Sequence, residues 1–574
     1  MFGFVDRVFG KRLVRSVARV HALGGLALLC LIASGGCTAD RGAGDDEADG
    51  GLSGGGPFVA PPIFGPGADP TTVEVFGGAM GGEAPQAVYP FDGVMLAQNI
   101  NQMRLAFVAA ASHSFYRLTV ESPRYRQVIY LGDAACSARK CSYLVDDKVW
   151  ARISHQSGGR ATLTIDGTPG AGQPVGRATL QLQFSPQDVR GGLYYFATSK
   201  SGLLRVPFGA TKPVPYLLGT GSGGVKNCIG CHGVSRDGKK VAAVFNLPDG
   251  YAGIVDGADP SKYILEPIES DGARLWNFAS FSPDGSRLIT VWNGTLSLRD
   301  GTTGKLIKNV PGSLLGGRAA MPEWSPDGES IVFVRVSARG RLGSDFGSPD
   351  IKAGDWFLGD AGDIAVLPYN GGAFGPAVTI VPAVAAKEFH FYPTFSPDSQ
   401  WILFNSAATP GCASDSAGAK TGFNLKLVHC VSYDQTAARL RLVRARADQT
   451  PIELARAMRE PNKTTAWPKF APFQQGSLVF FTFSAKLDYG FVINQAEVHA
   501  SEDAYRPQIW MSGIDLSRAA GGVDPSYPPF WLPFQDAETN NHEAIWTQEL
   551  ACSRPGDCGS EFNCISGVCV PIIG

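Results

Sequence analysis

The residues best placed to do chemistry are two cysteines and a histidine near the middle of the chain. The segment Cys228-Ile-Gly-Cys231-His232 has the spacing at which c-type haem is attached to proteins. In that chemistry both thiols add to the vinyl groups of the haem, and the adjacent histidine ligates the iron. The pattern therefore predicts one covalent haem c on Cys228 and Cys231, with His232 as the proximal iron ligand.

Other interpretations of these residues stay open. A structural disulfide between Cys228 and Cys231 is the main one. A zinc site is disfavoured, because no second cysteine or histidine pair stands at finger spacing. A thioredoxin-type redox pair is disfavoured, because no βαβ pattern surrounds the motif. The flanks "GTGSGGVKN" and "SRDGKK" also differ from the helices that surround this motif in cytochromes c. If haem binds here, a sheet repeat must hold it.

The motif lies in the first of five similar segments. They are "HGVSRDGKKVAAV" from His232, "ASFSPDGSRLITV" from Ala279, "PEWSPDGESIVFV" from Pro322, "PTFSPDSQWILFN" from Pro393 and "PKFAPFQQGSLVFF" from Pro468. Each predicts a strand, a tight turn and a second strand, because Asp and Gly adopt turn conformations that other residues resist. The intervals between them leave room for one four-stranded unit of about 40–45 residues, with or without an inserted loop.

The Ser-Pro-Asp-Gly hairpins resemble the repeats of TolB-like β-propellers. The resemblance implies a ring of blades over residues 188–550. Strands at 191–209 and 542–550 would complete a sixth blade from the two ends, which removes the exposed edges that an open array leaves. We therefore expect a six-bladed TolB-like β-propeller, with seven blades as the alternative.

The same alignment suggests where the cysteine motif sits in the ring. It places His232 where three other repeats have proline (Pro322, Pro393 and Pro468). The motif then replaces the segment that begins the innermost strand of a blade. In WD-type propellers this segment lies beside the central channel, so a haem attached there would sit over the channel mouth.

The alignment also names candidates for the distal iron ligand. Met321 occupies the position of Cys231 in its own repeat, His390 occupies that of Ile229, and His542 begins the closing strand. Ordinary packing is the alternative for each of the three, and a five-coordinate iron is a further possibility.

Two smaller units flank the expected ring in an all-β chain. Residues 86–187 hold runs such as "MRLAFVAAA", "SFYRLTVES", "RQVIYLG", "VWARISH" and "ATLQLQFSP", which read as short strands separated by turns. We expect an immunoglobulin- or fibronectin-like β-sandwich there. Residues 551–574 are too few to fold without covalent links, so we expect a small disulfide-rich module.

The N-terminus predicts export to the bacterial cell envelope. Basic residues precede the apolar run "ALGGLALLCLIA", which ends at Ser34-Gly35-Gly36-Cys37. Residues 1–37 resemble a lipoprotein signal peptide. The resemblance implies a lipid on Cys37, a membrane contact through that anchor alone, and, with Thr38 rather than Asp next, an outer-membrane location. An ordinary secretory signal is the alternative. Residues 38–85 predict a flexible linker rich in glycine and acidic residues.

Export makes disulfides the expected state of most of the twelve cysteines. Eight of them pair most simply in four bridges. They are the neighbours Cys136 and Cys141, the neighbours Cys412 and Cys430, and the last four, Cys552, Cys558, Cys564 and Cys569, whose pairing the sequence leaves open.

Two functions remain in view. The near balance of 50 basic and 52 acidic residues gives no reason to expect a nucleic-acid partner. The first function is a membrane-anchored c-type haem protein that transfers electrons to an unknown redox partner, and the sequence does not separate a carrier from a redox enzyme. The second is a propeller without haem that binds an envelope protein or polysaccharide, with Cys228 and Cys231 in a disulfide.

Overall fold

The computed structural model describes residues 56–572 of the 574, except 220–227, 248–250, 268–274, 337–340, 344–355, 359–361, 384–387, 409–434, 436, 462 and 496–504. The predicted signal peptide with Cys37, residues 38–55 of the predicted linker, and the predicted pair Cys412 and Cys430 lie outside these residues. The described part is all-β, and no helix in it is long and apolar enough to cross a membrane.

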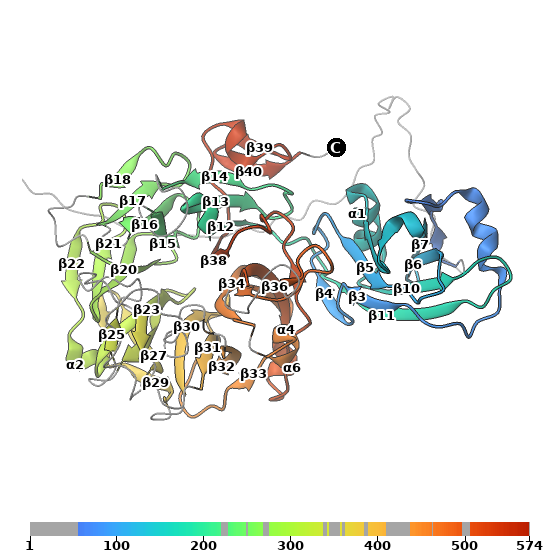
Figure 1. Ribbon diagram of the computed structural model, residues 1–574. Helices are drawn as coiled ribbons and strands as arrows, with labels where there is room; N and C mark the ends of the chain where they lie inside the picture. The colour runs from blue at the N-terminus through green and yellow to red at the C-terminus, as the bar shows by residue number, and fades with distance from the viewer. Residues whose placement is uncertain are drawn as a thin grey trace, which may run out of the picture. The chain divides into compact units, whose positions relative to one another are not determined.

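Six antiparallel sheets, each built mainly from strands consecutive in sequence, make up most of the described chain (Figure 1). The first holds β15 (Cys228–Val234), β16 (Lys240–Leu247), β17 (Tyr251–Asp256) and β18 (Tyr263–Leu265). The second holds β19 (Phe278–Phe281), β20 (Arg287–Trp292), β21 (Thr295–Asp300) and β22 (Leu306–Asn309). The third holds β23 (Arg318–Trp324), β24 (Ser330–Val336), β27 (Asp363–Asn370), β28 (Ala373–Phe374) and β29 (Val378–Val381).

The remaining three sheets follow the same plan. The fourth holds β30 (Phe389–Phe395), β31 (Trp401–Ala407), β32 (Arg439–Arg444) and β33 (Ile452–Glu453). The fifth holds β34 (Ala466–Gln475), β35 (Leu478–Ala485), β36 (Gln508–Asp515) and β37 (Phe530–Trp531). The sixth joins β38 (Asn541–Thr547) to β12 (Gly192–Ala197), β13 (Gly202–Pro207) and β14 (Val214–Leu217). A separate hairpin pairs β25 (Arg341–Gly343) with β26 (Trp356–Leu358).

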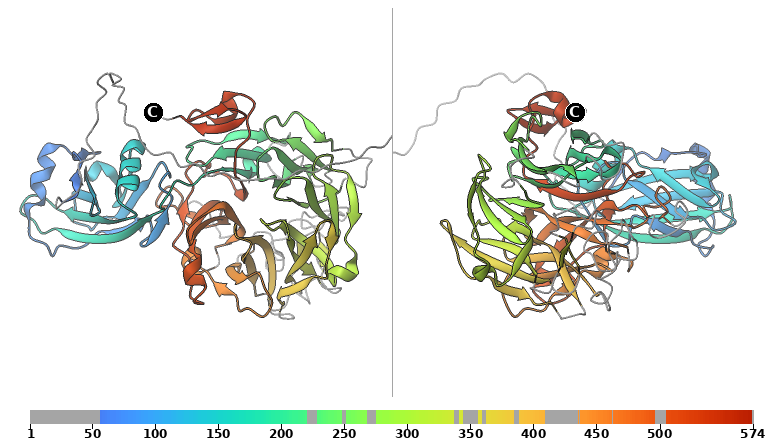
Figure 2. Two further views of the ribbon diagram at one scale, coloured as in Figure 1. Left: turned by 180° about the vertical axis from the view of Figure 1, so that it is seen from behind. Right: turned by 60° about the vertical axis from the view of Figure 1, so that its left-hand side comes forward.

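The contacts between these sheets run in a closed circle. In each sheet, the strand named first above is called the innermost strand. Each innermost strand contacts that of the next sheet, in the order β15, β19, β23, β30, β34 and β38, and β38 contacts β15. Figure 2 shows the sheets arranged around this circle. The sixth sheet closes the circle with backbone hydrogen bonds, since Leu193 pairs with Trp546 and Tyr194 with Ile545. The two end segments, 191–209 and 542–550, therefore pair in one sheet as expected.

Four of the turns that follow an innermost strand share one set of hydrogen bonds. In each, a serine hydroxyl donates to the aspartate two residues later and accepts a backbone N–H at 2.9 Å from the residue five later. The hydroxyl–carboxylate distances lie between 2.5 and 2.7 Å for Ser235–Asp237, Ser282–Asp284, Ser325–Asp327 and Ser396–Asp398. Such side-chain bonds fix a tight turn locally, and their recurrence confirms the register of the sequence alignment.

The N-terminal part of the described chain consists of two sheets, one α-helix and two short 3-10 helices. One sheet has the order β1-β7-β6-β10-β11-β4, with β2 also on β7, and the other has the order β3-β5-β9-β8. Their bounds are β1 (Phe58–Val59), β2 (Ile63–Phe64), β3 (Gln86–Tyr89), β4 (Val94–Leu96), β5 (Arg104–Val108), β6 (Phe115–Glu121), β7 (Tyr125–Gly132), β8 (Cys136–Ser137), β9 (Lys140–Leu144), β10 (Arg160–Thr168) and β11 (Gly176–Phe184). Side chains of both sheets share one apolar core, in which the rings of Phe107 and Tyr116 lie 5.1 Å apart.

Two expectations for this part are wrong. Residues 56–85 belong to the folded unit rather than to the flexible linker predicted for 38–85, because β1 and β2 pair in parallel with β7. The run "VWARISH" is not a strand but lies in helix α1 (Asp147–Gln156). Asp146 caps this helix by accepting the N–H groups of Lys148 and Val149, and Trp150 and Ile153 are its buried apolar residues.

The other helices among the residues that the structure describes are short. They are η1 (Pro70–Gly77), η2 (Asp133–Ala135), η3 (Thr198–Lys200), α2 (Gly312–Leu315), α4 (Ala455–Met458), α6 (Leu516–Ala519) and η7 (Pro555–Cys558). The chain thus builds its framework from sheets, and the helices serve as connections.

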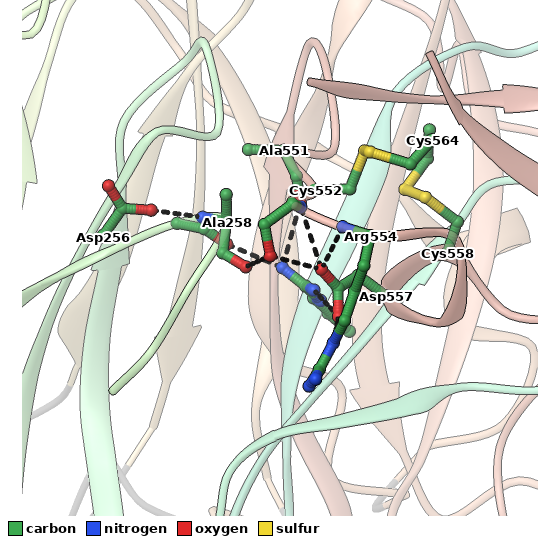
Figure 3. Close-up of a disulfide and its surroundings, with 12 residues drawn as sticks. Asp256, Ala258, Ala551, Cys552, Arg554, Asp557, Cys558 and Cys564 are labelled. Atoms are coloured by element: carbon green, nitrogen blue, oxygen red, sulfur yellow. Dashed lines mark hydrogen bonds and ion pairs between the residues drawn. A yellow bond between two sulfur atoms is a disulfide. The ribbon is translucent and has the colours of Figure 1, made fainter. Parts of the chain in front are cut away.

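The C-terminal segment is a disulfide-linked module around the hairpin of β39 (Phe562–Ile565) and β40 (Val568–Pro571). Cys552 is bonded to Cys564 and Cys558 to Cys569, which settles the pairing that the sequence left open. Asp557 organises the segment between Cys552 and Cys558 by accepting the N–H groups of Ser553 and Arg554. Figure 3 shows Asp557 next to Arg554 in this module. The Cys136–Cys141 bridge is also confirmed.

Candidate functional site

The innermost strands carry a repeated backbone irregularity. In five of the six, one non-glycine residue has a left-handed conformation with φ between 48° and 57°, and each lies where pairing with the second strand shifts. These inner bulge residues are Cys231, Met321, Tyr392, Trp467 and Glu543. The backbone conformation is uncommon for residues other than glycine, and bulges redirect side chains.

Three of the inner bulge residues and the ring of Phe278 form a chain of contacts across the circle. The ring of Tyr392 stacks on Trp467 with centroids 3.8 Å apart, and Trp467 stacks on Phe278 at 6.4 Å. The backbone N–H of Tyr392 donates to Sδ of Met321 at 3.3 Å. Because β19 and β34 are separated by two innermost strands on either side, the contact between Phe278 and Trp467 spans the circle. Apolar side chains therefore fill the centre at this level.

A cluster of two buried and two half-buried polar residues also lies on the innermost strands. It comprises His232 of β15, Glu323 of β23, Lys469 of β34 and Glu543 of β38, and is called the central polar cluster below. Lys469 Nζ pairs with the carboxylate of Glu323. The same carboxylate accepts the hydroxyl of Thr394 at 2.6 Å and the N–H of Phe395 at 3.0 Å. Glu323 thus links three neighbouring sheets.

His232 is the most enclosed member of the central polar cluster. Its side chain has no exposed surface. Nε2 lies 3.3 Å from the carbonyl oxygen of Tyr194, so this nitrogen carries the proton and donates it. Nδ1 makes no hydrogen bond within the described part of the chain and lies 3.6 Å from Oε2 of Glu543. The two residues join the first sheet of the circle to the last.

Burial determines the charge of this pair. It lowers the pKa of His232 to about 4, with a further lowering by the positive charge of Lys469, while the bond to Tyr194 opposes the shift. Burial raises the pKa of Glu543 to about 8, and Lys469 opposes that shift. Both side chains are therefore uncharged at pH 7. A protonated Glu543 needs only a small movement to donate its proton to Nδ1 of His232.

The described residues of the cysteine motif do not fit a haem in this arrangement. A c-type haem needs Nε2 of the histidine and both thiols to face one porphyrin. Nε2 of His232 is turned to Tyr194 instead, and the enclosed ring presents no nitrogen to open space. Cys231 is half-buried, and the side chain of Cys228 lies outside the described residues. His232 would have to leave both neighbours before it could ligate iron, so the haem stays a prediction.

The three candidate distal ligands occupy separate surroundings. Met321 contributes its sulfur to the apolar centre. His390 is buried, with Nε2 3.4 Å from the carbonyl oxygen of Pro382 and its ring edge-on to Phe404. His542 is buried beside β12, and burial together with the charge of Lys486 lowers its pKa to about 3.

Sequence reasoning missed the acidic and basic members of the central polar cluster. Glu323 and Lys469 both stand two residues before the residue that begins the turn of their repeat, which is Ser325 or Ala471. This alignment position is next to that of His232, so comparing it across the repeats would have found both residues. Glu543 had no such signal, because the closing strand lacks a hairpin of its own. A second group of clustered cysteine sulfurs, from Cys552, Cys558 and Cys569, has metal-like spacing but is engaged in two disulfides.

Comparisons with known proteins give distant likenesses only. No protein-family model matches the chain, and no curated protein matches it. A solved structure described as a TolB from Agrobacterium tumefaciens is 16% identical, with a TM-score of 0.31, over 62% of this chain and 99% of its own. The nidogen–laminin complex is 9% identical, with a TM-score of 0.34, over 62% of this chain and 98% of its own. A protein described as a 6-phosphogluconolactonase from Bacteroides uniformis is 14% identical, with a TM-score of 0.30, over 52% of this chain and 92% of its own.

Proposed function

We propose that this chain is a TolB-like propeller of six blades that acts as a binding scaffold in the bacterial cell envelope, without a haem. The six sheets are the blades, and the two N-terminal sheets are an immunoglobulin- or fibronectin-like sandwich. The closed circle of contacts and the four identical Ser–Asp turns support this assignment.

One observation carries the choice of a scaffold over a haem protein. His232 is enclosed between Tyr194 and Glu543, and the stacked rings of Phe278, Tyr392 and Trp467 span the circle of innermost strands. A haem over the channel would have to displace these side chains. A scaffold needs none of that rearrangement, because it binds partners on its outer surfaces and at the junctions between its parts.

The proposed location rests on the sequence and on the disulfides. Three bridges among the described residues suit an oxidising compartment. Together with the lipoprotein-like segment 1–37, they support a chain that is exported and held at the outer membrane through a lipid on Cys37.

A c-type haem for electron transfer is the second candidate, favoured by the spacing from Cys228 to His232 itself. The two functions separate in a reduced pyridine haemochrome spectrum of protein made in a host with cytochrome c maturation. The scaffold predicts a colourless protein. A c-type α band would overturn it, and loss of that band in a His232→Ala variant would assign His232 to the iron.

A further inference from the structure

An open groove of about 610 Å³ lies between the N-terminal sheets and the fifth sheet of the ring. Asp92, Arg160 and Gln183 line it on the first side, and Arg456, Arg518 and Tyr527 line it on the second. Residues from the N-terminal sheets and from the ring can hold one ligand together only if these two parts stay at a fixed distance from each other.

Aromatic contacts fix the two sides of this groove to each other. Tyr89 packs edge-on against Tyr489 with ring centroids 4.9 Å apart, and its hydroxyl accepts the N–H of Trp531 at 3.2 Å. Phe91 stacks on Trp510 at 6.2 Å, and the guanidinium of Arg459 lies 4.3 Å over the ring of Phe91. The groove is therefore a built feature of the junction between the sandwich and the ring.

The guanidinium groups that line the groove have N–H donors that can bind a ligand. Within the described residues, the guanidinium groups of Arg160 and Arg456 make no hydrogen bond and no ion pair, and both residues are exposed. Arg518 uses Nη2 to donate to the carbonyl oxygen of Asp524 at 2.9 Å and lies 5.8 Å over the ring of Tyr527. Three arginines from three separate elements therefore line one groove.

The two carboxylates in the lining do not neutralise these arginines. Asp515 accepts the N–H and the hydroxyl of Ser517, and those bonds lower its pKa against the effect of its burial. Asp92 accepts the N–H of Gln181 at 2.7 Å. Asp515 also accepts bonds from Ser477 and from the N–H of Arg518. Asp92 keeps an oxygen that can accept a hydrogen bond from a hydroxyl group, and the three arginines outnumber the two aspartates.

We propose that this groove binds an acidic saccharide of the uronic acid type. The fork of an arginine matches a carboxylate with two parallel hydrogen bonds. The remaining oxygen of Asp92 and the amide of Gln183 suit sugar hydroxyls, and the half-buried ring of Tyr527 offers an apolar face to a sugar ring. An acidic peptide would supply the carboxylates but few hydroxyl donors, and would bring its charges close to the two aspartates.

The inference deepens the proposed scaffold function and rests on it, since it names the class of envelope ligand that the scaffold holds. Calorimetric titration of the full chain with tetragalacturonate, at low and at physiological salt, tests it. We expect saturable binding that weakens with salt, and no binding of the methyl-esterified tetramer. Arg160→Ala and Arg456→Ala should each weaken binding about tenfold or more, as expected for the loss of a charged hydrogen bond.

Arg446→Ala is the matched control, because Arg446 is also exposed but lies outside the groove. It should leave the affinity unchanged. Absence of binding, equal binding of the esterified tetramer, tighter binding of hexaglutamate, or affinities unaffected by Arg160→Ala and Arg456→Ala would each overturn the proposal. A haemochrome spectrum of the same preparation distinguishes failure of one proposal from failure of the other. If the protein shows a haem band and still binds the saccharide, only the haem-free scaffold is refuted.

Discussion

Nδ1 of His232 lies 3.6 Å from Oε2 of Glu543, although 310 residues separate them in the chain. The first residue belongs to the innermost strand of the first sheet, and the second to the strand that closes the sixth. The pair therefore lies at the junction where the ring closes. Its uncharged state follows from burial, which moves the two pKa values in opposite directions.

Replacing Glu543 with glutamine should change how stability depends on pH. The pKa of Glu543 is raised on folding, so its contribution is fully present below its unfolded value of about 4.5 and is lost as the pH rises through about 8. The variant lacks this titration. We expect its melting temperature, relative to the native chain, to rise between pH 5 and about pH 8 and then to level off.

Differential scanning fluorimetry across that range measures the effect. Glu538→Gln is the matched control, because the side chain of Glu538 is 79% exposed. A constant difference between Glu543→Gln and the native chain from pH 5 to pH 9 would contradict an uncharged Glu543.

Removal of His232 should destabilise the ring without any haem being involved. In His232→Ala, the carbonyl of Tyr194 loses its buried hydrogen-bond donor, and that loss costs about 1–3 kcal/mol. Urea unfolding at pH 7 should show a lower midpoint for the variant.

The effect of His232→Ala should also depend on acidity. Because folding lowers the pKa of His232, the native residue contributes stability above its unfolded value of about 6.5, and this is lost as the pH falls through about 4. The gap between variant and native chain should therefore shrink on acidification. A gap that widens on acidification would mean that His232 is charged when folded.

The ion pair of Lys469 and Glu323 should show strong coupling in a double-mutant cycle. Each single change, Lys469→Met or Glu323→Gln, leaves a partly buried charge without its partner. Glu323→Gln should cost more, because Glu323 also accepts bonds from Thr394 and Phe395. We expect the double variant to be more stable than the sum of the single losses predicts, by about 1 kcal/mol or more. Additive losses in urea unfolding would contradict a direct pair.

Reduction of the disulfides should loosen the C-terminal module before the ring. The bridges Cys552–Cys564 and Cys558–Cys569 close loops of 12 and 11 residues, and such a bridge contributes about 2–4 kcal/mol. Under a mild reductant, hydrogen exchange should rise in residues 551–572 while the innermost strands stay protected. Simultaneous loss of protection in β38 and β12 would show that the module is part of the closure of the ring.

Much of the ring could be predicted because its signals are local. The turns at Ser282, Ser325 and Ser396 are fixed by hydrogen bonds within six residues, so the sequence itself contains the reason for each hairpin. The two ends of the sixth sheet could be predicted for a different reason, since unpaired edges of a ring need partners.

The remaining features depend on contacts that no short window contains. Strands β1 and β2 have two residues each in a stretch rich in proline and glycine, and they exist because β7 offers them an edge. The residues Val149, Trp150 and Ile153 favour strands, so the sequence predicts a strand where the structure has helix α1. The side chain of Asp146 stabilises the helix instead by capping its first turn. The surroundings of His232 arise from strands that only the closed ring brings together.

The account is tested most directly by the intact mass of the denatured full chain, purified from a host that attaches haem c, with a map of the peptide that contains Cys228 and Cys231. We predict a mature chain whose mass contains no haem, and a peptide without a haem adduct. A chain heavier by one haem, with the added mass on both cysteines of that peptide, would contradict the account and make electron transfer the working function.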